Sequence, residues 1–219
     1  QQGNARRPPR SSACCCCRIY RSQAHRSCRD GTCLSGLSNA PHCPEDCART
    51  PGRKTRYDLI SVWKGNRLVN MDSQAPNKIA GEYIPQLFPK TTLVKPEQKM
   101  GNSRLDFYIE TGDGRKIFME VKGVTLEQEN VVLFPDAPTE RGIKHLKELV
   151  SCIAQGYEAY VLFVVQMERV KYFTPNDKTH PAFGQALREA AKLGVQVQAV
   201  DCIVTEDTVI PNREVMIKL

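Results

Sequence analysis

Near the middle of the sequence, three consecutive segments read Ser103-Arg-Leu-Asp-Phe-Tyr-Ile-Glu110, Thr111-Gly-Asp-Gly-Arg115 and Lys116-Ile-Phe-Met-Glu-Val-Lys122. Two runs in which apolar and polar residues alternate flank an Asp-Gly turn, a pattern typical of a β-hairpin. A turn centred on Asp113 places Asp106 opposite Glu120, and the Cβ atoms of such cross-strand neighbours lie about 4.5–5.5 Å apart. Because side chains alternate between the faces of a strand, Lys122 is expected on the same face as both acids.

The opposite face of this hairpin is wholly apolar. Its expected pairs are Leu105 with Val121, Phe107 with Met119, and Ile109 with Ile117. Such a face must be buried, so the register is constrained from both sides, since a slip by one residue would turn charged side chains into the core. Tyr108 and Phe118 are expected to share the charged face, which indicates a lined cleft rather than an open surface.

The charged face has the composition of a metal site. Two carboxylates held this close repel each other, and a divalent cation between them removes the repulsion. Oxygen ligands suit Mg²⁺ or Mn²⁺, so Asp106 and Glu120 are predicted as ligands, with the backbone carbonyl of Val121 as a further one. Lys122 would lie beside the same metal and orient an attacking water or stabilise charge on phosphorus. In the alternative interpretation, these side chains form a solvated surface with a weak cross-strand salt bridge.

Outward from the hairpin, the sequence predicts an α/β fold. Helices are expected over 77–88, 139–155 and 182–193, with Asn77 and Thr139 as N-caps. Strands are expected over 57–63, 67–71, 125–126, 131–134, 160–166, 170–173, 195–204 and, as a further candidate, 215–219. This order of elements indicates a mixed β-sheet flanked by helices. Glu82, on the first helix, is expected to approach the metal through water.

The composition is that of a globular protein, with 41% hydrophobic and 25% charged residues. The longest apolar run, Tyr160–Val165, is far shorter than a membrane span, and no stretch of signal-peptide character follows the early arginines. The only cysteines beyond residue 50, Cys152 and Cys202, are expected as buried free thiols, and the chain is expected to be cytoplasmic. The formal charge of +7 is concentrated in residues 1–50, so a nucleic-acid surface elsewhere requires local clustering of basic side chains.

Residues 1–50 differ in character from the rest. They contain eight of the ten cysteines, four of them consecutive at 14–17, and eight arginines against three acidic residues. A zinc module and a disulfide knot are two options; the residues spaced for zinc are Cys28, Cys33, His42, Cys43 and Cys47. The third interpretation is a segment with no fold of its own. The bias towards Arg, Cys, Ser and Pro is typical of a G+C-rich gene read out of frame, so we expect a frameshifted, non-native stretch.

The acids and the lysine together resemble the PD-(D/E)xK nuclease superfamily. Its pattern is an acid on a first helix, an Asp on one strand and (D/E)-x-K on the next, and the matching residues would be Glu82, Asp106, Glu120 and Lys122. Leu105 replaces the proline of that pattern. Gln166, which ends the strand Val161–Val165, resembles a late glutamine of several such nucleases, and an ordinary polar strand end is the alternative.

Six segments are similar to those of the sugar fermentation stimulation protein family. They are Gln74-Ala-Pro-Asn-Lys78, Arg104-Leu-Asp-Phe107, Glu120-Val-Lys122 with Val124-Thr-Leu126, Phe134-Pro-Asp-Ala-Pro-Thr-Glu-Arg-Gly142, Leu162-Phe-Val-Val-Gln166 and Phe173-Thr-Pro-Asn-Asp177. The resemblance covers residues 53–219. It implies that 53–72 is a remnant of an OB-like β domain and that 73–219 is a restriction-endonuclease-like domain. The resemblance also implies the properties of the family's members, which are prokaryotic and cytoplasmic, bind DNA and are linked to the regulation of sugar metabolism, especially that of maltose.

The predicted function is DNA binding by a nuclease-like cleft, with Mg²⁺- or Mn²⁺-dependent phosphodiester cleavage as a candidate activity. The catalytic residues would be Lys122, Glu120 and Asp106, and the nucleic-acid contacts would be Lys122, Arg141, Gln166 and Arg104. Two alternatives stay open. One is a non-catalytic DNA-binding regulator that keeps a relic acid cluster. The other is a protein-interaction module with no nucleic-acid role.

Overall fold

The computed structural model describes residues 20–21, 59–101 and 103–219. The predictions for residues 1–50 lie outside this range except at β1 (Tyr20–Arg21), which pairs in parallel with β2 (Ser61–Lys64). β2 pairs antiparallel with β3 (Arg67–Asn70), so the two strands predicted here are present. The assignment of residues 53–72 to an OB-like remnant stays a prediction.

A six-stranded mixed sheet lies at the centre of the described part of the chain. In spatial order its strands are β12 (Val209–Glu214), β11 (Gln196–Val204), β9 (Glu158–Val165), β6 (Lys116–Val124), β5 (Ser103–Thr111) and β4 (Thr91–Met100). β11, β9 and β6 run parallel to one another, and the other pairings are antiparallel. The predicted α/β fold with a mixed sheet is therefore confirmed, and β6, which carries Glu120 and Lys122, is an interior strand.

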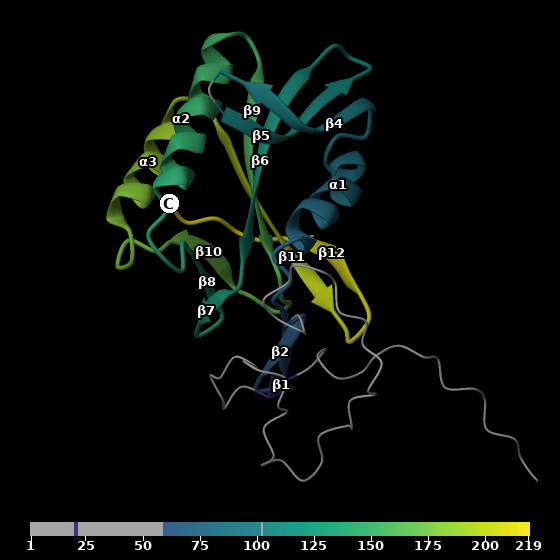
Figure 1. Cartoon of the computed structure of the whole chain (residues 1–219), viewed down its shortest axis with the longest axis vertical. Coiled ribbons are helices and arrows are strands. Elements are labelled where there is room, and N and C mark those ends of the chain that lie inside the picture. The colour runs from purple at the N-terminus through teal and green to yellow at the C-terminus, as the bar shows by residue number, and fades with distance from the viewer. Residues whose placement is uncertain (1–19, 22–58, 102) are drawn as a thin grey trace, which may run out of the picture.

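Helices cover both faces of this sheet (Figure 1). α1 (Ala75–Leu87) packs over an apolar cluster that includes Met119 and Leu162. α2 (Glu140–Ala154) and α3 (Pro181–Lys192) pack over a second cluster, on the opposite face, that includes Val161 and Phe163. β9 contributes to both clusters in alternation, as expected for a parallel strand buried on both faces. Among the described residues, no helix is both long enough and apolar enough to cross a membrane.

A small sheet extends the α2 side of the molecule. It consists of β10 (Tyr172–Pro175), β8 (Val131–Phe134) and β7 (Leu126–Gln128), with β8 in the middle. β10 runs parallel to β8, and β7 is antiparallel to it. Phe163 of β9 stacks on Phe173 of β10 with ring centroids 4.1 Å apart, so aromatic packing joins the small sheet to the large one.

The β5–β6 hairpin has the predicted register along its ladder. The recorded pairs include Phe107 with Met119, Tyr108 with Phe118, and Ile109 with Ile117. Leu105 departs from the prediction, because it belongs to the cluster beneath α2, whereas Phe107 belongs to the cluster beneath α1. The cause is a local break: the β5–β6 ladder stops short of Asp106, and the β4–β5 ladder skips Glu97, whose φ is 51°.

Two edge strands have no counterpart among the predicted elements. β4 contains Lys95-Pro96-Glu97 and lacks alternation, and a proline is tolerated there because β4 is at the sheet edge. β12 replaces the last strand expected at 215–219, where only Ile217 forms an isolated bridge. The buried Asp201 of β11 accepts hydrogen bonds from Asn212 and Arg213 and so fixes β12, through contacts that no local pattern reveals.

The helix caps follow the prediction in one case and depart from it in the other. Thr139 caps α2, because its Oγ1 accepts the backbone N–H of Gly142 at 3.0 Å. α1 begins at Ala75, and its N-cap, Gln74, makes no side-chain cap bond. Asn77 therefore lies inside the helix and is not its cap. Its side chain is free to reach across to β5.

Candidate functional site

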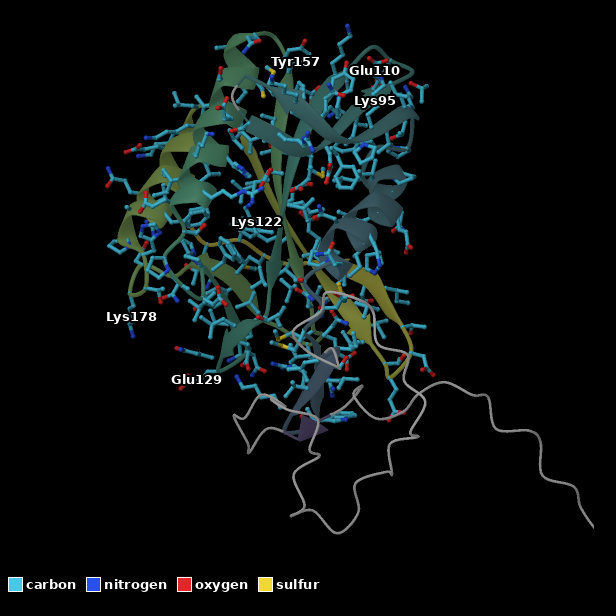
Figure 2. The ribbon with its side chains drawn as sticks, viewed as in Figure 1. Lys95, Glu110, Lys122, Glu129, Tyr157 and Lys178 are labelled. Atoms are coloured by element: carbon cyan, nitrogen blue, oxygen red, sulfur yellow. The ribbon has the colours of Figure 1, made fainter. Side chains whose placement is uncertain are left out.

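Asp106, Glu120 and Lys122, here called the acid–lysine cluster, lie at the middle of the molecule. Figure 2 shows Lys122 between α1 and α2, whereas Lys95, Glu129 and Lys178 lie at the periphery. In the parallel ladder with β9, Glu120 pairs with Val161 and Lys122 pairs with Phe163. Val161 and Phe163 belong to the cluster beneath α2, so Glu120 and Lys122 share that face of the sheet, as predicted.

Glu120 is a buried carboxylate whose two oxygens differ, because one has hydrogen-bond partners and the other has none. Its Oε1 accepts Lys122 Nζ at 2.6 Å and also contacts His145 Nδ1. Its Oε2 is buried without a hydrogen-bond partner. Burial alone would raise the pKa of Glu120, but the hydrogen bonds from His145 and Lys122 outweigh it, so the pKa lies below its ordinary value. Glu120 is therefore ionised at neutral pH and leaves Oε2 available to a ligand.

Asp106 is held by two elements at once. Its Oδ2 accepts the backbone N–H of Val121 at 2.8 Å, and its Oδ1 accepts Asn77 Nδ2 at 2.9 Å. The first bond explains the broken ladder, because the carboxylate occupies the place that a strand carbonyl would take. Burial and then the nearby charge of Glu120 raise the pKa of Asp106. The two carboxylates thus lie close enough to interact, and their pKa values are pushed in opposite directions.

A cavity of about 360 Å³ opens beside these residues. It is lined by Met71, Ser73, Pro76, Asn77, Val121, Lys122, Gly123, Thr125, Asp136 and Gln166. Three residues predicted for the site, Val121, Lys122 and Gln166, are therefore in its wall. The lining comes from the start of α1, from β6 and from the segment after β8.

Gly123 is required by the close approach of two elements at this wall. A Cβ built on it would lie 2.6 Å from Gln166 Oε1 and 2.6 Å from Pro76 Cγ. Real Cβ atoms do not tolerate such contacts, so any larger residue would push α1 away from β6. The absence of a side chain at Gly123 thus allows α1 to bring Asn77 to Asp106.

Gln166 serves as a structural tie. It is buried, and its Nε2 donates to Asn70 O at 3.2 Å, Asn70 Oδ1 at 2.7 Å and Asp72 O at 3.1 Å. These bonds fasten the segment that leads into α1 to the end of β9. The amide nitrogen is thus saturated within the protein, which favours the structural interpretation of this residue over direct nucleic-acid contact.

We expect Gln166→Met to lower the free energy of unfolding by about 1–3 kcal/mol, because it leaves buried carbonyl acceptors without a partner. Equilibrium unfolding in urea measures this change. Gln185→Met on the exposed side of α3 is the matched control and should change stability by no more than about 0.5 kcal/mol. Equal midpoints for the two variants would mean that the Gln166 amide bonds contribute nothing to stability.

Three other predicted residues are placed outside the cluster. Glu82 is exposed on α1, and the helix residue that reaches Asp106 is Asn77, five positions earlier, on a different side of the helix. Arg104 is exposed and pairs with Glu97 at 3.1 Å. Arg141 is exposed at the start of α2 and touches the cluster indirectly, because its Nε lies 3.4 Å from His145 Nε2.

Two functional candidates, His145 and Asn77, are absent from the predicted set. The buried residues of α2 include Gly142, His145, Leu149 and Cys152, a stripe at helical spacing that places a histidine on the inward side. That stripe is a usable signal in the sequence. Asn77 has no comparable signal, because the same residue type reads equally well as an N-cap.

The donor set suits a hard cation that keeps water ligands. In the part of the chain that the structure describes, no three His, Cys, Asp or Glu side chains group as a metal site by themselves. Mg²⁺ commonly binds through one or two carboxylates and retains several waters, so Asp106 and Glu120 with the Val121 carbonyl are compatible with it. Glu120 Oε2 is buried and has no hydrogen-bond partner, so a cation bound to it would satisfy its lone pairs.

Comparisons with known proteins agree with this arrangement of elements. The sequence model described as "Sugar fermentation stimulation protein RE domain" matches residues 74–208. A sugar fermentation stimulation protein homolog from Desulfitobacterium hafniense (strain Y51) is 60% identical over 168 residues, which cover 76% of this chain and 73% of that protein. A homolog from Clostridium beijerinckii is 56% identical over 161 residues, with 73% and 71% of the two chains covered.

A solved structure is also similar. The structure of Pyrococcus furiosus SfsA in complex with Ca²⁺ matches with a TM-score of 0.69 and 30% sequence identity, over 79% of this chain and 77% of that chain. Residues 74–208, which the family model matches, include the β5–β6 hairpin with Asp106, Glu120 and Lys122, and the helices α1, α2 and α3. This chain therefore belongs to the sugar fermentation stimulation protein family.

Proposed function

We propose that this protein binds DNA at the cavity beside Lys122, lined by the start of α1, β6 and the segment after β8, and cleaves a phosphodiester bond with the help of a divalent cation held by Asp106 and Glu120. The observation that carries the proposal is the buried, unpartnered Oε2 of Glu120 next to a second carboxylate and a lysine. A link to the regulation of sugar metabolism, as the family's name suggests, is part of the same proposal.

The choice of cation rests on the donors. Both side-chain donors are carboxylate oxygens, and Val121 offers a backbone carbonyl, so Mg²⁺ or Mn²⁺ is favoured over a metal that prefers nitrogen or sulfur. The Pyrococcus furiosus relative is in complex with Ca²⁺, another cation that prefers oxygen ligands. A restriction-endonuclease-like arrangement of this half of the chain is consistent with the same site.

The residues of this chain have separable tasks in the proposed reaction. When bound, the cation polarises the phosphodiester and lowers the pKa of water. Asp106 and Glu120 bind and orient, and their own orientation is fixed by Asn77, Val121 N–H and His145. Lys122 lines the cavity, and its ammonium group, which bonds Glu120 Oε1, would stabilise negative charge that develops on phosphate oxygens.

DNA is expected to enter along the basic side chains nearest the cavity. Lys122 lies in the cavity wall, and Arg141 is exposed at the N-terminus of α2, where the helix dipole also favours a phosphate. Arg104 belongs to an outer position, because it is exposed on β5 and paired with Glu97. These contacts bind the backbone and carry no base specificity.

A non-catalytic DNA-binding regulator is the second candidate. The observation in its favour is that Glu120 Oε1 already receives both Lys122 and His145, so the acid is neutralised without a metal. In that case DNA binding would be salt-dependent and no metal would be needed.

Cleavage assays separate the two candidates. Purified protein should cut labelled single- or double-stranded DNA with Mn²⁺ but not with EDTA, and Lys122→Ala should remove cleavage while it weakens DNA binding modestly, with a smaller salt slope. Lys192→Ala, on the exposed last turn of α3, is the matched control and should behave as wild type. Salt-dependent DNA binding without cleavage under any metal would favour the regulator, and no salt-dependent binding would reject both.

A further inference from the structure

His145 is the one buried histidine on the inward side of α2, and both of its ring nitrogens have partners. It is 5% exposed. Its Nδ1 contacts Glu120 Oε1, and its Nε2 lies 3.4 Å from the Nε of Arg141, four residues earlier on the same helix. Buried polar atoms are hydrogen-bonded in most proteins, and both ring nitrogens of His145 follow that rule.

The partners determine the tautomer of the ring. The guanidinium of Arg141 is a donor only, so His145 Nε2 must accept from it. In the neutral ring the proton then resides on Nδ1, which donates to Glu120. The ionised Glu120 carboxylate can only accept, so it favours the same tautomer, and the long bond from Arg141 adds to that preference. The remaining N–H groups of Arg141 stay available to a phosphate, so this role does not compete with DNA binding.

The consequence appears at Glu120. Its Oε1 receives two donors, His145 Nδ1 and Lys122 Nζ, from different elements of the fold. Rotation of the carboxylate would break both hydrogen bonds. Oε2 is therefore the oxygen of this carboxylate with free lone pairs, and it is buried without a hydrogen-bond partner.

We propose that His145 is a positioning residue that orients the Glu120 carboxylate towards the cation, and that Arg141 helps to stabilise the tautomer with the proton on Nδ1. This inference rests on the proposed function, because it assumes a cation at Asp106 and Glu120. His145 itself touches neither cation nor substrate. Hydrogen-bond partners that orient a metal ligand in this way typically contribute tenfold to hundredfold to metal affinity.

Matched substitutions at His145 test the role of Nδ1. The amide nitrogen of Asn stands the same number of bonds from Cα as Nδ1, and that of Gln stands as far as Nε2. We therefore expect His145→Asn to keep Mn²⁺ affinity within about threefold, and His145→Gln and His145→Ala to lose about tenfold to hundredfold. Isothermal titration of Mn²⁺ into DNA-free protein measures the affinity, and the urea midpoint of each variant verifies folding.

Glu120→Gln separates failure of this inference from failure of the proposed function. If Glu120→Gln binds Mn²⁺ like the wild type, there is no cation at this acid and both proposals fall. If Glu120→Gln loses binding while His145→Gln does not, the cation site stands and the positioning role is rejected. Equal losses in His145→Asn and His145→Ala would also reject it, because they would show that Nδ1 is not the atom that matters.

Arg141 provides a test that does not depend on altering a buried residue. Arg141→Met removes the donor to Nε2 from an exposed position, and we expect Mn²⁺ affinity to fall about twofold to tenfold, the size of one hydrogen bond. Imidazole ¹⁵N resonances of the metal-free wild type should show a protonated Nδ1 and an unprotonated Nε2. A ring protonated at Nε2, or unchanged Mn²⁺ affinity in Arg141→Met, would overturn the assigned role of Arg141.

Discussion

Glu120→Ala and Asp106→Ala should each abolish Mn²⁺ binding, with a loss of at least about 100-fold, because even an outer hydrogen-bond partner of a ligand is worth tenfold to hundredfold. Each change removes one of the two carboxylates proposed as ligands. Lys122→Ala should affect Mn²⁺ binding far less than either acid variant, because the lysine makes no ligand bond and His145 still holds Glu120 Oε1. Titration of Mn²⁺ into the DNA-free variants measures these differences.

DNA affinity should move in the opposite direction in Asp106→Ala and Glu120→Ala. Loss of a carboxylate reduces the repulsion of phosphate near the cavity, so both acid-to-alanine variants should bind DNA as well as the wild type or more tightly. A solvated surface salt bridge predicts nearly silent changes throughout. Unchanged metal and DNA affinities across all three variants would therefore return the cluster to that simpler interpretation.

Glu82→Ala is the matched control for the acid variants. Glu82 occupies the helix position at which the nuclease motif places an acid, yet it is exposed, and Asn77 is the α1 residue bonded to Asp106. We expect Glu82→Ala to bind Mn²⁺ like the wild type. A loss comparable to that of Asp106→Ala would mean that Glu82 approaches the cation, as the sequence motif predicts.

The central hairpin was predictable because its restraints are local. An Asp-Gly turn and two alternating strands fix which residues face each other, and Phe107 with Met119 and Ile109 with Ile117 follow directly. The same argument failed at Leu105, where the Asp106 side chain replaces a ladder carbonyl at Val121 N–H. A side chain that takes the place of a backbone hydrogen-bond partner does not change the alternation of apolar and polar residues, so the sequence pattern does not reveal it.

Long-range partners account for the rest of what the sequence could not supply. His145 meets Glu120 across 25 positions, and Gln166 meets Asn70 across 96. Such pairs depend on how α2 and the strand β9 pack, which no single segment encodes. Asp106, Glu120 and Lys122 could be predicted from the sequence because they share one hairpin. The residues that orient them, Asn77 and His145, come from α1 and α2.

Phe163→Ala should lower the free energy of unfolding by about 3–5 kcal/mol, the usual range for removal of a buried aromatic ring. Phe163 is fully buried on β9, stacks on Phe173 at 4.1 Å and lies 5.5 Å from the ring of Phe134. Its loss opens a cavity between the large sheet and the small one. Urea unfolding of the purified variant measures the change.

Two further variants make this prediction specific to the aromatic junction. Phe163→Leu keeps most of the volume and should cost clearly less than Phe163→Ala, because less of the cavity is left open. Leu193→Ala, at a site that is 59% exposed, should stay within about 0.5 kcal/mol of the wild type. Phe163 pairs with Lys122 in the parallel β6–β9 ladder, so weaker packing around Phe163 should also make β6, which carries Lys122, more mobile. If Phe163→Ala lowers the free energy of unfolding by less than about 1 kcal/mol, contacts other than this stack hold the small sheet to the large one, because removal of a well-packed ring normally costs more.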